Sequence, residues 1–179
     1  MHQGVIGLIQ ESFSNRLASL WRRYRFVAVF IAIFAACQLT AVSSRIYIAD
    51  WLVAAPAGWT LAALFPTDEV SVVANRITST RARLNILPGC EGTELFFLLI
   101  AGVLATPARW RGKLSGLGIG LSLAFALNQI RVAVLYWVVR DHAAQFELVH
   151  GYLAPTALVI GLGVFFHIWS AGVLRPGGQ

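Results

Sequence analysis

Long apolar runs separated by short polar stretches dominate the pattern of this chain. A helix needs about 20 predominantly apolar residues to cross a bilayer. Four runs approach or exceed that length, and polar or turn-forming residues bound each of them. The pattern therefore predicts an all-α polytopic membrane protein, a single integral membrane domain over residues 1–179, with transmembrane helices at 26–44, 93–106, 114–139 and 151–173.

The segment before the first span has a different pattern. Within residues 1–25, Phe13, Leu17 and Leu20 recur at helical spacing among arginines. This pattern is typical of an amphipathic helix that lies on the membrane surface. A cleaved signal peptide is the alternative, but the basic cluster is late and Ala41-Val42-Ser43 is a weak cleavage site.

Residues 45–66 are less regular, because Asp50 lies near the start and Pro56-Ala57-Gly58 interrupts the run. They predict an interfacial or partly inserted helix, and a full crossing stays open. In the polar segment 67–92, two alternating stretches flank turn-type residues. Such a pattern predicts a small β-hairpin that leads to the turn carrying Cys90.

The distribution of basic residues does not decide the orientation. Cytoplasmic loops are usually richer in Lys and Arg, but the count is eight against five whether or not residues 45–66 cross. Asp50, Pro56 and the shortness of the run favour no crossing, which places residues 67–92 on the extracytoplasmic side.

Composition supports a membrane protein. Only 12% of the residues are charged and 58% are hydrophobic, whereas soluble domains carry about 25% charged residues. The net charge of +6 comes from basic residues at the ends of apolar runs, so we predict no nucleic-acid partner. Cys37 lies within an apolar run and Cys90 at the edge of another, which argues against a disulfide.

Three polar residues stand out against this background. Cys90 begins the second span, Arg131 lies inside the third, and His150 begins the fourth. A chain that crosses by one helix and returns by the next ends on the side where it started. All three residues are therefore predicted on one side of the membrane, in either orientation.

These residue types suit acyl transfer. The start of a helix and a nearby cation both favour a thiolate, Arg131 and Asn128 share a helical face and could stabilise an oxyanion, and His150 could transfer protons. The alternatives are a packed inert thiol, an arginine that reaches the interface with its long stem, and an interfacial histidine. Glu91 opposes a thiolate at Cys90.

Metal and cofactor sites receive little support. Cys90, His142 and His150 would suffice for catalytic zinc with one water, but no ligand pair has the usual close spacing. The run Gly116-Leu117-Gly118-Ile119-Gly120 follows no strand and is not a dinucleotide loop. It predicts close helix packing instead, as do Gly161 and Gly163. We predict no metal and no cofactor.

The ordered motifs resemble the exosortase/archaeosortase family. They are Pro88-Gly89-Cys90-Glu91-Gly92, Asn128-Gln129-Ile130-Arg131 and Leu148-Val149-His150, with Lys113-Leu114 at the start of the middle span. The resemblance covers about residues 68–170. The short length is similar to the compact exosortase H-like branch.

The resemblance implies a sortase-like thiol protease or transpeptidase of the bacterial inner membrane, with its site on the extracytoplasmic face. Its expected partners are membrane lipid and exported proteins that end in a short motif, a transmembrane helix and a basic cluster. Cys90 would be the nucleophile, Arg131 the oxyanion or thiolate stabiliser, His150 the proton-transfer residue and Asn128 a support for Arg131. Glu91 departs from the small or polar residues that are commoner there.

Two other functions stay open. A non-catalytic membrane scaffold or transporter subunit would use Arg131 to bind an anion or a lipid headgroup, and Cys90 would then be dispensable. A protease that hydrolyses without transfer shares every residue with the transpeptidase.

Overall fold

The computed structural model describes residues 24–41, 47–87 and 92–174. Within these ranges, three helical segments are long and apolar enough to cross a membrane: Tyr24–Ala41, α5 (Trp110–Asp141) and the continuous run Ala143–Val173. The last run is made of η3 (Ala143–Gln145), α6 (Phe146–Leu148), η4 (Val149–Leu153) and α7 (Ala154–Val173). The prediction of a mostly helical chain is confirmed, and three of its helices have the length and apolar composition of membrane spans.

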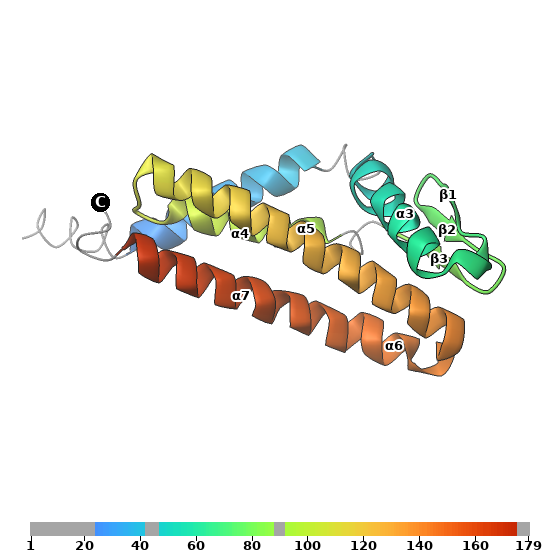
Figure 1. Ribbon diagram of the computed structural model, residues 1–179. Coiled ribbons are helices and arrows are strands. Elements are labelled where there is room, and N and C mark those ends of the chain that lie inside the picture. The colour runs from blue at the N-terminus through green and yellow to red at the C-terminus, as the bar shows by residue number, and fades with distance from the viewer. Residues whose placement is uncertain (1–23, 42–46, 88–91, 175–179) are drawn as a thin grey trace, which may run out of the picture.

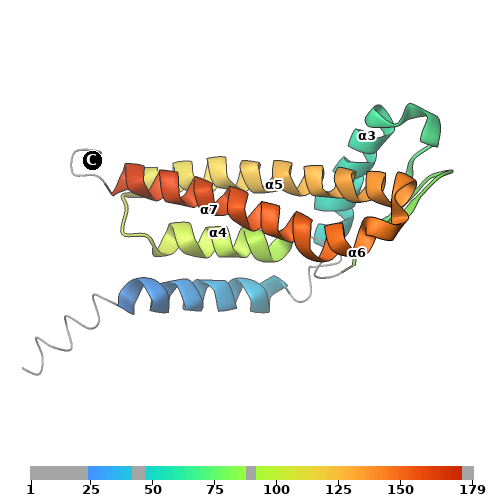
Figure 2. The ribbon, with the colours of Figure 1, turned by 90° about the horizontal axis from the view of Figure 1, so that it is seen from below.

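The second predicted span is a shorter helix than the others. α4 (Thr93–Ala105) is apolar but has 13 residues. At 1.5 Å per residue it is about 20 Å long, less than the roughly 30 Å of a hydrocarbon core. It lies beside α5 and α7 (Figures 1 and 2). The predicted amphipathic helix falls mainly on residues 1–23, outside the described part.

Glycines allow close contact between α5 and α7. A Cβ atom on Gly116 would lie 2.5 Å from Cε2 of Trp169, and one on Gly120 would lie 2.6 Å from Cε1 of Phe165. Small residues let membrane helices approach closely, as the sequence predicts at these positions. Gly118 and Gly163 differ, because a Cβ atom there would meet nothing within 4 Å.

The polar segment forms a sheet with one more strand than predicted. β1 (Ser71–Val73), β2 (Arg76–Thr78) and β3 (Arg83–Asn85) form an antiparallel sheet in the order β1-β2-β3. The two stretches predicted as hairpin arms do not pair with each other, because β2 lies between them. The residues read as a turn hold β2, and the β1–β2 turn is tight, with Ala74 at φ +53°.

The sheet packs against α3 (Ala55–Leu64) and the C-terminal part of α5. Ile77 and Leu84 are paired across β2 and β3 and point into a buried cluster with Leu61, Val132 and Tyr136. The π-helix η1 (Ile48–Ala54) precedes α3. Figure 2 shows α3 running across the direction of the long helices, and Figure 1 shows the sheet at the α6 end of the bundle.

Candidate functional site

A buried polar pair lies on α5. Asn128 is 2% exposed and Arg131 is 9% exposed, and residues three apart share one face of a helix. An ionisable side chain inside an apolar helix is expensive to bury and marks a functional site by default. The structure therefore places two of the predicted site residues together, facing the protein interior.

The distance of this pair from the start of α5 can be compared with the thickness of a bilayer. With 1.5 Å of rise per residue, Asn128 lies about 27 Å and Arg131 about 32 Å from Trp110, where α5 begins. These lengths are close to the roughly 30 Å thickness of a hydrocarbon core. Beyond Arg131, α5 packs against the sheet and α3 rather than against α4. The pair thus lies at the level where the bundle gives way to the sheet.

The start of α4 lies directly against Asn128. Gly92 is the N-cap of α4 and has φ +79°, a conformation that favours glycine. A Cβ atom on Gly92 would lie only 2.7 Å from Oδ1 of Asn128. Both the backbone conformation and the close approach therefore require glycine here. Cys90 precedes Gly92 by two positions and lies outside the described residues.

His150 lies in the π-helix η4 and is half-buried. The sequence places the start of the last span at Gly151, but the helical run begins at Ala143 and passes through His150. The His150 ring stacks on Phe146 with 5.0 Å between centroids. The adjacent Val149 is buried with Val132, so η4 packs on the part of α5 that follows Arg131.

His142, the other histidine near this end, ends α5 and packs edge-on against Trp137, with 4.8 Å between the ring centroids. In the ranges that the structure describes, no group of three His, Cys, Asp or Glu residues is arranged to hold a metal ion.

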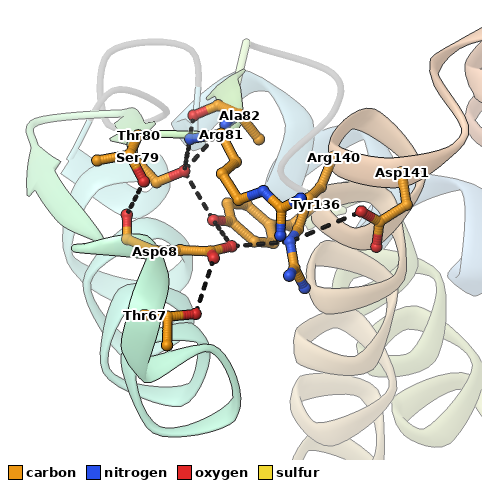
Figure 3. Close-up of polar contacts among 9 residues, drawn as sticks. All are labelled: Thr67, Asp68, Ser79, Thr80, Arg81, Ala82, Tyr136, Arg140 and Asp141. Atoms are coloured by element: carbon orange, nitrogen blue, oxygen red, sulfur yellow. Dashed lines mark hydrogen bonds and ion pairs between the residues drawn. The ribbon is translucent and has the colours of Figure 1, made fainter.

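The sequence did not single out a second polar cluster, which is centred on Asp68. This side chain is fully buried. Its Oδ2 lies 3.0 Å from the Tyr136 hydroxyl and 3.0 Å from Nε of Arg140, and Thr67 donates to Oδ1 at 3.4 Å (Figure 3). The Arg140 guanidinium also lies 4.7 Å from the centre of the Phe65 ring. The buried carboxylate therefore has a cation and a hydroxyl beside it.

Ser79 extends this cluster into the turn between β2 and β3. The Tyr136 hydroxyl lies 2.7 Å from Ser79 Oγ, which also accepts hydrogen bonds from the backbone N–H groups of Arg81 and Ala82. The Thr80 hydroxyl donates to the Asp68 carbonyl (Figure 3), and the Thr80 N–H donates to the same carbonyl. The cluster thus joins the segment before β1 and the turn between β2 and β3 to the last turns of α5.

A signal for this cluster exists in the sequence. Tyr136 and Arg140 are four residues apart, so they share one face of α5, and Asp68 is an acid at the start of the polar segment. Their pairing crosses 68 positions of the chain, which helical periodicity does not reveal.

A scan against protein-family models finds no match to this chain, and neither a search of curated proteins nor a search of solved structures finds one. The geometry of the chain's own residues is therefore what bears on its function. The start of α4 contacts Asn128 on the face of α5 that also carries the buried Arg131.

Proposed function

We propose that this chain is a membrane cysteine protease or transpeptidase of the exosortase/archaeosortase type, which cleaves C-terminal sorting signals of exported proteins. The observation that carries the proposal is the packing of Gly92 on Asn128, beside the buried Arg131. Two peptide units extend at most about 7 Å. A thiol two residues before Gly92 is therefore within reach of the donors on α5.

In the proposed reaction, the Cys90 thiolate attacks the carbonyl carbon of the scissile peptide and forms a C–S bond. Negative charge moves to the carbonyl oxygen, where the Arg131 guanidinium and the Asn128 amide donate hydrogen bonds. The C–N bond then breaks, and His150 gives its proton to the departing amine. An acceptor amine or water attacks the thioester, His150 takes a proton from it, and the thiolate leaves.

The proposed site lies at the extracytoplasmic surface of the bacterial inner membrane. Gly92 is level with Asn128, about 27 Å along α5 from Trp110, and the chain returns to Trp110 through α4 and residues 106–109. α4 and its following loop thus cover nearly the depth of a hydrocarbon core. This supports α4 as a fourth crossing and places the sheet, in this proposal, at the same membrane surface as the site.

An apolar groove suits the transmembrane helix of the proposed substrate. It lies between the Tyr24–Ala41 helix, α4 and α7 and encloses about 330 Å³. Phe26 and Phe30 line one side, and Gly163 lines the other, where an added Cβ atom would meet nothing within 4 Å. Small residues at such positions allow close helix contact. The groove therefore supports a substrate whose signal includes a membrane helix.

Replacement of Cys90 tests the proposal. The chain would be produced together with an exported protein that ends in a short motif, an apolar helix and a basic tail. With Cys90→Ala or Cys90→Ser, the full-length substrate should accumulate. The matched control is Cys37→Ala, which changes a thiol on the Tyr24–Ala41 helix and should leave processing unchanged. Processing at the unaltered rate in Cys90→Ala would falsify the nucleophile assignment.

The burial of Arg131 also favours a second candidate, a membrane scaffold or transporter subunit that binds an anion or lipid headgroup. In that case Cys90→Ala has no effect on function, whereas Arg131→Gln removes anion binding. Comparison of Cys90→Ala with Arg131→Gln therefore separates the two functions.

A further inference from the structure

A second cavity lies between the η1–α3 segment and β1. It encloses about 440 Å³, and its lining includes Asp50, Trp51, Ala55, Trp59, Ala62 and Val72. Among the described residues, Asn128, Arg131 and His150 of the proposed reaction do not line it. The cavity is therefore separate from the polar face of α5 and calls for its own explanation.

Small residues on α3 create the space. Ala55 and Ala62 are seven positions apart and lie on one side of the helix, with Gly58 between them. A Cβ atom on Gly58 would overlap the Val72 side chain, so glycine lets β1 approach α3 at this point. On either side of that contact, the alanines leave room that larger side chains would fill.

Asp50 gives the cavity an anionic wall. Asp50 lines the cavity, and its Oδ1, which is buried, has no hydrogen-bond partner among the described residues. A buried carboxylate oxygen without a partner is costly, and the described residues that line the cavity include no Lys, Arg or His. Asp50 also lies in the π-helix η1, where its carbonyl accepts the N–H of Ala55. Such π-turns occur frequently at functional sites.

Two indole rings complete the wall. Trp51 and Trp59 both line the cavity, and each is 77% exposed, so their rings are accessible to a ligand that enters from outside. Indole faces attract organic cations, and several aromatic rings together recognise ammonium groups. A metal ion does not fit the described part of this lining, which offers one carboxylate and no second acidic or histidine ligand.

We propose that this cavity binds an organic ammonium group on a short apolar stem. The Asp50 carboxylate pairs with the charge, the Trp51 and Trp59 rings contact the cation, and the alanines of α3 contact the stem. Two sources supply this chemistry: the amine headgroup of a phospholipid, and a soluble or peptide amine. The site does not depend on the proposed reaction.

Tryptophan fluorescence of the purified full-length protein in uncharged detergent micelles tests the proposal. Titration with n-butylammonium chloride should give a saturable change in emission, whereas n-butanol and sodium chloride at equal ionic strength should not. Asp50→Asn should raise the midpoint about tenfold or more, because the charge pairing is lost. Asp50→Glu should retain binding. The control Asp141→Asn, which removes an acid from outside the cavity, should leave the midpoint unchanged.

Ala62→Phe provides a test that keeps the charge. Ala62 is exposed on α3, so the larger ring fills the cavity without disturbing the core, and saturable binding should disappear. In lipid nanodiscs, phosphatidylethanolamine should raise the butylammonium midpoint relative to phosphatidylglycerol if the headgroup is the ligand, and equal midpoints identify a soluble amine. Equal responses to n-butanol and n-butylammonium, or unchanged binding in both Asp50→Asn and Ala62→Phe, would overturn the proposal.

Discussion

The Tyr136 hydroxyl lies 3.0 Å from Oδ2 of Asp68, and both side chains are fully buried. One partner precedes the sheet and the other lies near the end of α5. Together with Arg140, this contact fixes the sheet on the helix that carries Asn128 and Arg131. The cluster and the contact of Gly92 with Asn128 therefore both hold N-terminal parts of the chain on the second half of α5.

Asp68→Asn should destabilise the protein by about 3 kcal/mol, because breaking a buried charge pair leaves Arg140 uncompensated. Tyr136→Phe removes the contacts of the hydroxyl with the carboxylate and with Ser79 Oγ but leaves the charge pair, and it should cost about 1.5–3 kcal/mol. Unfolding in detergent, followed by near-UV circular dichroism, measures both. Asp141→Asn is the control, since this carboxylate is 3.8 Å from Arg140 Nε and 32% exposed, and it should cost under about 1 kcal/mol. An effect of Asp68→Asn no larger than that of Asp141→Asn would contradict the role of the cluster.

Local periodicity predicts part of this fold well. The long apolar runs give the helices, and Gly116 and Gly120 give the close contact of α5 and α7. β2 was missed because its three residues contain an arginine and a threonine among turn-type neighbours, and only pairing on both sides makes them a strand. The extension of the last helix to Ala143 was missed because residues 143–150 are mixed in polarity.

In the candidate site, too, the sequence predicts the features that depend on helical spacing but not the contacts between distant segments. Asn128 and Arg131 are three positions apart, so helical spacing alone predicts that they share a face, and their burial agrees with it. The contact of Gly92 with Asn128 and that of Asp68 with Tyr136 join distant parts of the chain. Such pairings depend on how α4 and the sheet dock onto α5, which no local pattern encodes. Cys90 lies outside the described residues, so its role stays a prediction.

Gly92→Ala should destabilise the start of α4 by about 1–3 kcal/mol, because a side chain at φ +79° is strained, and its Cβ atom would meet Asn128. Adding Asn128→Ala should recover the steric part of the loss and leave the backbone part. Chemical denaturation of the single and double variants measures this coupling. Gly163→Ala is the control, since a Cβ atom there meets nothing within 4 Å, and it should stabilise its helix slightly. Equal stabilities of Gly92→Ala and Gly163→Ala would refute the assigned contact.

Gly116→Leu should separate α5 from α7, because its Cβ atom would lie 2.5 Å from the Trp169 ring. Overpacking of this kind costs about 1–3 kcal/mol. The change should appear as a lower unfolding temperature and as altered Trp169 fluorescence, since its indole N–H donates to the Gly112 carbonyl at 3.1 Å. Gly118→Leu, two residues along the same helix with open space around it, should change neither. A loss of stability as large in Gly118→Leu would show that leucine itself, and not the contact, is responsible.

Arg131→Lys distinguishes the proposed catalytic role of Arg131 from a general need for positive charge. Lysine retains the charge but lacks the planar fork of donors that suits an oxyanion. Loss of one oxyanion donor typically lowers the rate about 10²–10³-fold, so Arg131→Lys and Asn128→Ala should each reduce substrate cleavage by about that factor. Arg111→Lys, at the opposite end of α5 and exposed, should cleave normally.

The measurement is the single-turnover rate in purified protein, with thermal unfolding to confirm that each variant is folded. A folded Arg131→Lys variant that cleaves at the unaltered rate would exclude the guanidinium from the reaction. Loss of anion binding in Arg131→Gln, together with no substrate cleavage by the purified unaltered protein, would instead favour the scaffold or transporter role.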